Sequence, residues 1–257
     1  MRRIAAVAEY IFKQSFRNKI LNVLILFAVF AIGFSLAISE LAQEAEIKMV
    51  VDFGLFAISL FAFLTIVLSM TVQLFEETEL KTLMVIMVKP IKRHEYILGK
   101  YLGMMLTVLM NILIMLAILM LIVSFRGGEP WDIKLILAAM YSFLSIGILA
   151  AVAMLLSVVT TSVPGCIIFL ISAYATGHLT IHLKNLVDKT GSPAIKAVVD
   201  FIYYVVPNLE LFNLKDKIHS GQALFDMNYL GLVLGYTVTY ITVMLVCTSI
   251  IFSKKEF

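Results

Sequence analysis

Long apolar blocks separated by short polar stretches dominate the pattern of this chain. Six blocks can be read, and each is long enough, or nearly so, to cross a bilayer as a helix of about 20 residues. The fifth is the weakest, because it is short, opens with Pro164 and Gly165 and carries His178 near its end. The pattern predicts an all-α membrane protein with six transmembrane helices. In chain order, the blocks are residues 20–38, 53–72, 102–124, 135–159, 164–179 and 229–252.

Residues 1–19 show the amphipathic pattern of a surface helix. Apolar side chains recur on one side of a helical wheel and charged side chains recur on the other. A cleaved signal peptide is the alternative, but Glu9 and Lys13 interrupt the apolar core that such a peptide needs. We therefore expect an interfacial helix that is retained. Its apolar side holds Ile4, Ala8, Ile11, Phe12 and Phe16, and its charged side holds Arg2, Glu9, Lys13 and Arg17.

The stretch between the fifth and sixth blocks, residues 180–228, contains a shorter helical pattern. Apolar residues follow helical spacing from Ile195 to Val206, and turn residues stand before them at 191–193 and after them at 207–208. At about 13 residues this helix is too short to span a bilayer. We expect it to lie in the outer interface or to enter the membrane as a re-entrant element. An outer gate and a cap that seals the bundle are both open interpretations.

Composition agrees with a membrane protein. Hydrophobic residues make up 61% of the chain, charged residues 14%, and the mean hydropathy is +1.01. We expect one transmembrane domain over residues 1–257, since no stretch is large enough for a soluble domain. The net charge of +3 is too small to indicate nucleic-acid binding. Cys166 and Cys247 both lie in apolar runs, which argues against a disulfide or a zinc site.

Lysine and arginine predict the orientation. They gather in residues 2–19, 81–100 and 254–255, whereas the short loops on the other side hold only Lys48, Arg126 and Lys134. Five more lysines lie in the long stretch 180–228, where five acidic residues match them in number. Basic residues in short loops favour the cytoplasmic side of a membrane. Both termini and the stretch 75–100 are therefore predicted to be cytoplasmic. In a bacterium this would place the chain in the inner membrane, with residues 180–228 facing the periplasm.

The chain lacks the sequence pattern of a nucleotide-binding P-loop. Such a loop around Gly99 and Lys100 would need glycine at position 94 and serine or threonine at 101, where the chain has His94 and Tyr101. The chain is therefore not expected to be an enzyme. Asn111, near the middle of the third block, is a polar side chain that hydrocarbon penalises. We expect it to hydrogen-bond a neighbouring helix, and lining a transport pathway is the alternative.

The stretch 75–100 combines an acidic cluster, an apolar stripe, a proline and a basic patch. Glutamates at 76, 77 and 79 suit the first turn of a helix, because carboxylates complement the positive end of the helix dipole. Pro90 ends this helix, and a new one is expected to begin near His94 and to run into the third block. The pattern predicts a short amphipathic helix at the membrane surface. Its stripe, at positions i, i+3, i+4 and i+7, is Leu80, Leu83, Met84 and Met87.

The same stretch resembles a known family. It looks like the segment between the second and third spans of type-two ABC exporter permeases, the class that includes the permease of the nitrous oxide reductase maturation system. The pattern E-x4-T-L-x6-P-x2-R-x-E-Y-x2-G-K is carried by Glu77, Thr82, Leu83, Pro90, Arg93, Glu95, Tyr96, Gly99 and Lys100. The amino-terminal helix, the six blocks and residues 207–210 extend the resemblance over nearly the whole chain. Lys81 stands where many members have glycine.

The resemblance implies partners and roles. It implies a membrane subunit that forms a dimer with itself or a similar permease and binds two copies of a separate ABC ATPase, which would hold ATP and Mg²⁺. No cofactor or metal is expected in this chain. The short helix between helices 2 and 3 would be a coupling helix whose apolar stripe fills a groove of the ATPase. Arg93 and Glu95 would make polar contacts at the rim of the groove, and Gly99 would let the next helix pack closely.

The expected function is therefore the permease subunit of an ABC exporter, which forms the translocation pathway in the lipid bilayer. Two alternatives stay open: a scaffold or gating subunit of an ATP-linked complex, and a gradient-driven transporter or channel. The apolar blocks are nearly free of charged residues, which disfavours ion coupling. The same property favours an apolar, amphipathic or peptide-like cargo. A periplasmic accessory protein is left open as a further partner.

Overall fold

The computed structural model describes residues 2–17, 25–26, 28–34, 46–71, 75, 92–127, 133–190, 206–213 and 227–254, and within the described part all regular structure is helical. The side chains of residues 180–190 are not described. The elements are α1 (Arg2–Arg17), α3 (Glu46–Ile66) with the π-helix η1 (Val67–Thr71), α6 (Arg93–Phe125), α7 (Ile133–Val159), α8 (Val163–Thr190), the 3₁₀-helix η2 (Leu209–Phe212) and α11 (Met227–Lys254).

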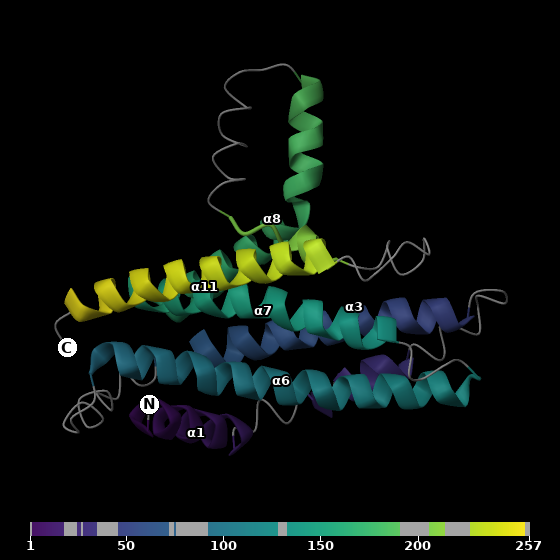
Figure 1. Ribbon diagram of the computed structural model, residues 1–257, viewed down its shortest axis with the longest axis horizontal. Helices are drawn as coiled ribbons and strands as arrows, with labels where there is room; N and C mark the ends of the chain where they lie inside the picture. The colour runs from purple at the N-terminus through teal and green to yellow at the C-terminus, as the bar shows by residue number, and fades with distance from the viewer. Residues whose placement is uncertain are drawn as a thin grey trace.

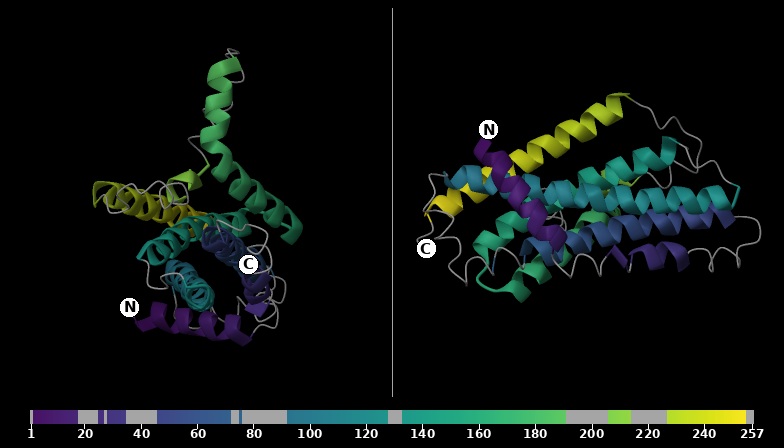
Figure 2. Two further views of the ribbon diagram at one scale, coloured as in Figure 1. Left: turned by 90° about the vertical axis from the view of Figure 1, so that its right-hand side faces the viewer. Right: turned by 90° about the horizontal axis from the view of Figure 1, so that it is seen from below.

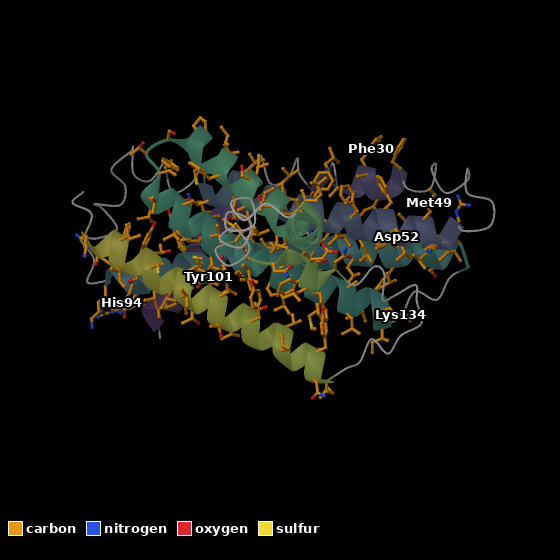
Figure 3. The ribbon with its side chains drawn as sticks, turned by 90° about the horizontal axis from the view of Figure 1, so that it is seen from above. Phe30, Met49, Asp52, His94, Tyr101 and Lys134 are labelled. Atoms are coloured by element: carbon orange, nitrogen blue, oxygen red, sulfur yellow. The ribbon has the colours of Figure 1, made fainter. Side chains whose placement is uncertain are left out.

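Four long helices, α3, α6, α7 and α11, lie side by side and form the body of the molecule (Figure 1). Helix α1 crosses beneath α6, and the carboxyl-terminal part of α8 turns away from the bundle (Figure 2). Figure 3 places His94 near one end of the bundle and Met49, Asp52 and Lys134 towards the other end. We call these the Arg93 end and the Lys134 end.

Four helices among the described residues are long and apolar enough to cross a membrane. The apolar part of α8, Val163–Leu179, is shorter, and of the first apolar block, residues 20–38, the structure describes only 25–26 and 28–34. These helices confirm the prediction of an all-helical membrane protein. The count of six spans stays a prediction. The four helices are Ile47–Ser69, Arg93–Phe125, Ile133–Val159 and Met227–Lys254.

Two helices run beyond the apolar blocks that predicted them. Helix α6 begins at Arg93, ahead of the block at 102–124, as the pattern near His94 had indicated. Helix α8 continues to Thr190, beyond the block at 164–179 and into the predicted outer segment. No glycine or proline stands between His178 and Thr190, so nothing in the sequence stops the helix before Gly191. The predicted helix at 195–206 lies almost wholly outside the described residues.

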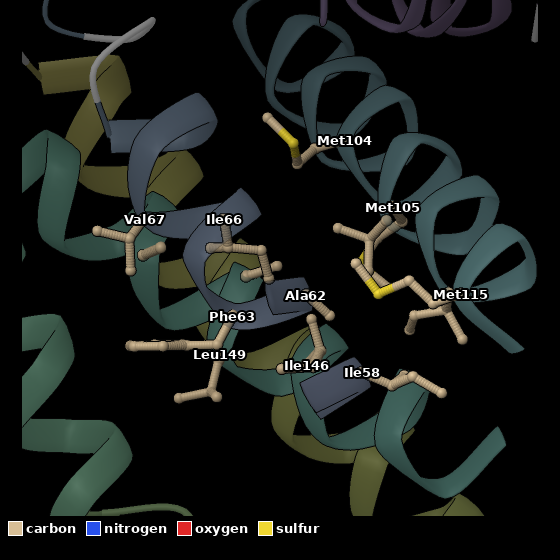
Figure 4. Packing of buried hydrophobic residues seen from close by; sticks show 14 of the residues in the cluster. Ile58, Ala62, Phe63, Ile66, Val67, Met104, Met105, Met115, Ile146 and Leu149 are labelled. Atoms are coloured by element: carbon tan, nitrogen blue, oxygen red, sulfur yellow. The ribbon is translucent and has the colours of Figure 1, made fainter. Parts of the chain in front are cut away.

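The core lies between α3, α6 and α7 (Figure 4). Methionines 104, 105 and 115 of α6 are buried in this core together with Ile58 of α3 and Ile146 of α7, and their flexible thioether side chains suit irregular space between helices. In α7, 67% of the most apolar window is buried, compared with 17% in α11. Helix α7 is therefore central, and α11 exposes most of its surface to whatever surrounds the bundle.

Candidate functional site

The Arg93 end gathers the start of α1, the start of α6 and the end of α11. The Nη1 atom of Arg93 donates hydrogen bonds to the carbonyl oxygens of Phe252 (3.1 Å) and Ser253 (2.8 Å). Nη1 of Arg3 lies 3.9 Å from Oε2 of Glu95. We call this set of contacts, together with Tyr96, Gly99 and Lys100 of α6, the junction. It stands where the stretch 75–92 leads into α6.

Arg93 caps helix α11. The last carbonyl groups of a helix have no partner within the helix and carry the negative end of its dipole. A guanidinium group placed there donates hydrogen bonds to these carbonyl groups, and its positive charge compensates the dipole. The contact joins the first residue of α6 to the last turn of α11, although the partners are 159 and 160 residues apart in the chain. The start of α6 and the last turn of α11 are therefore directly linked.

Glu95 stabilises the start of α6. Its Oε2 atom accepts a hydrogen bond from the backbone N–H of Lys92 at 3.0 Å, which satisfies one of the N–H groups left without a partner at the helix start. The ion pair with Arg3 of α1 is a second contact of the same oxygen. The Arg3 side chain is 53% exposed, so this pair contributes little energy and mainly aligns α1 with α6.

Two glycines let α1 pack directly on α6. A Cβ atom on Gly99 would lie 2.6 Å from Cβ of Val7, and one on Gly103 would lie 2.6 Å from the carbonyl oxygen of Ala8. Both distances are too short for any side chain, so only glycine permits this approach. Gly99 and Gly103 have the four-residue spacing of small residues that brings membrane helices together. Here the spacing seats the amphipathic helix α1 across the start of α6.

Lys100 lies inside the junction. Its side chain is fully buried, and its Nζ atom lies 3.4 Å from the hydroxyl of Tyr96, to which it donates, and 5.8 Å from the centre of the Tyr96 ring. The Tyr96 ring in turn stacks on Phe252 of α11, with centroids 6.0 Å apart. Removing an ammonium group from water costs free energy, so buried lysines are rare and commonly mark functional positions. Lys100 and Tyr96 form the inner layer of the link between α6 and α11.

Asn111 connects α6 to α3 further along the bundle. Its Nδ2 atom donates to Oγ1 of Thr65 at 3.1 Å, and that hydroxyl donates to the carbonyl oxygen of Phe61 at 2.8 Å. Oδ1 of Asn111 is buried and accepts no hydrogen bond within the described part of the chain. Thr65 stands just before the π-helix η1, a type of turn that often marks functional sites.

The structure brings four predicted residues into one place, namely Arg93, Glu95, Gly99 and Lys100. Arg3, Phe252 and Ser253 of the junction, and Gly103 beside it, were not predicted. The glycine spacing is a signal that could have found Gly103, whereas Arg3 carries no local signal. The other predicted coupling residues lie outside the described residues, so their docking roles stay predictions: Glu77, Leu80, Thr82, Leu83, Met84, Met87 and Pro90.

Long apolar helices side by side, with an amphipathic helix seated across one end, define this chain as an integral membrane protein. A family model described as "ABC-2 family transporter protein" matches residues 13–177. The match covers more than half of the chain, which therefore belongs to the ABC-2 transporter family. A comparison with curated proteins gave no match. The family consists of membrane permease components of ABC transporters, without an ATPase site of their own, and it implies an ABC ATPase as partner.

Proposed function

We propose that the chain is the permease subunit of an ABC exporter and that an ATPase docks on residues 75–100. The observation that carries the proposal is the capping of α11 by Arg93. The docking stretch leads directly into this residue, so a push or rotation there reaches two helices at once. Membership of the ABC-2 family supports the presence of an ATPase that supplies such a push.

The proposed mechanism is a rigid-body movement. Because α1 is seated on Gly99 and Gly103 and α11 is capped by Arg93, the Arg93 end moves as one unit of three helices. Closure of the ATPases on ATP and Mg²⁺ would tilt this unit against α3, α7 and α8. Such movements change the access of a central site from one side of the membrane to the other.

The assembly that fits this mechanism is a dimer of permeases with two ATPases. The distribution of basic residues supports placing the Arg93 end in the cytoplasm, both termini with it, and the Lys134 end outside. The motif at 77–100 supports a relationship to the permeases of the nitrous oxide reductase maturation class, and with it a location in a bacterial inner membrane. An outer accessory protein is compatible with this arrangement.

A native pull-down tests the proposal. The tagged chain is isolated from its own membranes, and the proteins retained with it are identified by mass spectrometry. We expect an ABC ATPase with the wild-type chain and with Met84→Leu, and its loss with Met84→Asp, because a carboxylate in the apolar stripe cannot be buried in a groove. Equal recovery of the ATPase with Met84→Asp and Leu83→Asp would show that the stripe is not the docking surface.

A further inference from the structure

A small cavity lined by both polar and apolar side chains lies between α3, α7, α8 and η2. Its volume is about 60 Å³, which is room for a few water molecules or one small head group. Polar side chains reach it from every one of these elements: Ser59 from α3, Ser142 and Ser145 from α7, His178 from α8 and Asn213 at the end of η2. The junction is a separate site, at the Arg93 end.

The depth of this cavity in the bundle makes it unusual. Ser59 lies near the middle of the span Ile47–Ser69, and Ser145 lies near the middle of Ile133–Val159. Polar groups at this depth are costly in a membrane and commonly mark the path of a transported molecule. The sequence pattern alone did not reveal the cluster, because Asn213 and Glu210 belong to a stretch that was expected to lie outside the spans.

Serine hydroxyls in helices usually bond to their own backbone, and two serines outside the cavity do so. The hydroxyl of Ser157 donates to the carbonyl oxygen of Ala153 at 2.6 Å, and that of Ser172 donates to Ile168 at 2.8 Å. No such bond is found for Ser142 or Ser145 among the described residues. These two hydroxyls are therefore available to a group in the cavity.

Two of the residues that line the cavity, His178 and Asn213, contact the carboxylate of Glu210. Nδ2 of Asn213 donates to Oε1 of Glu210 at 2.9 Å, and Nδ1 of His178 lies 3.9 Å from Oε2 of the same carboxylate. Nε2 of His178 is buried and forms no hydrogen bond in the described part of the chain, and it is an acceptor when the imidazole carries its proton on Nδ1, the nitrogen beside Glu210. No lysine or arginine lines the cavity in the described part of the chain.

We propose that this cavity binds a protonated amine carried by the cargo. The ammonium group would donate hydrogen bonds to the hydroxyls of Ser142 and Ser145 and to Nε2 of His178. The carboxylate of Glu210, which contacts the lining residue Asn213, would balance its charge. Leu55, Leu209 and Phe212 form an apolar wall for the adjoining carbon chain. Naming the ligand as cargo rests on the proposed function, but the binding itself needs no ATPase.

The wall formed by η2 is firmly held. The hydroxyl of Tyr236 accepts a hydrogen bond from the backbone N–H of Asn208 at 3.0 Å, and the hydroxyl of Tyr229 donates to the carbonyl oxygen of Leu211 at 2.6 Å. On the other side, a Cβ atom on Gly177 would lie 2.7 Å from Leu209 Cγ, so α8 and η2 are in direct contact. The cavity is thus a built site whose walls are fixed from both α8 and α11.

Ligand-observed saturation-transfer NMR on the full-length chain in phosphatidylcholine nanodiscs tests this proposal. The probes are n-butylammonium, butyrate and n-butanol, with empty nanodiscs as the background. We expect saturable binding of n-butylammonium, at least about tenfold tighter than that of the other two, because its charged hydrogen bonds have no counterpart in them. Equal binding of butyrate or butanol, or no saturable signal above empty nanodiscs, would overturn the proposal.

Three variants locate the binding. Ala138→Leu, which fills the cavity, should abolish binding of n-butylammonium, and Ser145→Ala should weaken it about three- to tenfold. Ser172→Ala, on the exposed side of α8, should bind like the wild type. Thermal unfolding checks the fold of each variant. If Ala138→Leu does not fold, the affinity of Ser145→Ala for n-butylammonium decides. Wild-type affinity in folded Ser145→Ala and Ala138→Leu would contradict the site. ATPase recovery in the pull-down is independent of this result.

Discussion

At the scale of single residues, the structure gives Arg93 a role that the family resemblance did not. The resemblance implied a polar contact with the rim of an ATPase groove, whereas the structure directs Nη1 of Arg93 at two carbonyl oxygens of α11. Both roles are compatible, because a guanidinium group carries five N–H donors. The contact inside the chain is the one with a measurable consequence in the absence of any partner.

Replacement of Arg93 by methionine should loosen the end of α11. The variant removes two hydrogen bonds from a charged donor and the compensation of the helix dipole, a loss of about 1–2 kcal/mol. Hydrogen exchange should become about tenfold faster in the last turn of α11. Arg93→Lys should restore part of the protection, because a lysine can still reach a carbonyl oxygen. Unchanged exchange in Arg93→Met would show that the capping contact has no influence on α11.

At the scale of elements, the packing of α1 on α6 depends on the absence of side chains at two positions. Gly99 and Gly103 bring the backbones of the two helices together, and Val7 and Ile11 of α1, both buried, face the contact. The amphipathic pattern predicted a helix here and placed Ile11 on its apolar side, but it did not place there the other two buried residues, Val7 and Ser15. It did not predict whether α1 would lie on the lipid bilayer or on another helix, since the surface of a transmembrane helix is as apolar as the bilayer.

A methyl group at Gly103 should separate α1 from α6. Gly103→Ala is expected to lower the stability of the protein by about 1–3 kcal/mol, because a Cβ atom there overlaps the backbone of α1. Gly235→Ala on α11 is the matched control, since nothing lies within 4 Å of a Cβ at that position. The control should be neutral or slightly stabilising. Thermal unfolding in detergent compares the two, and equal stability would argue against close packing at Gly103.

At the scale of the whole molecule, block length and helical periodicity predicted the long helices and the membrane class. They could not predict contacts between distant parts of the chain, such as Arg93 with α11 or Asn111 with Thr65. They also missed the cavity between α3, α7, α8 and η2, because Glu210 and Asn213 enter the bundle only after the chain folds back on α8 and α11. A linear pattern reports which side of a helix is apolar, but not which neighbour meets that side.

Cross-linking in intact membranes tests the central claim, docking of an ATPase on residues 75–100, most directly. A photoreactive amino acid is placed at Met84, and in a control at Arg126 near the Lys134 end. Illumination followed by mass spectrometry identifies the protein attached at each position. We predict an ABC ATPase attached at position 84 and none at 126. Attachment of the ATPase at 126, or its absence from positions 80, 83, 84 and 87 alike, would contradict the claim.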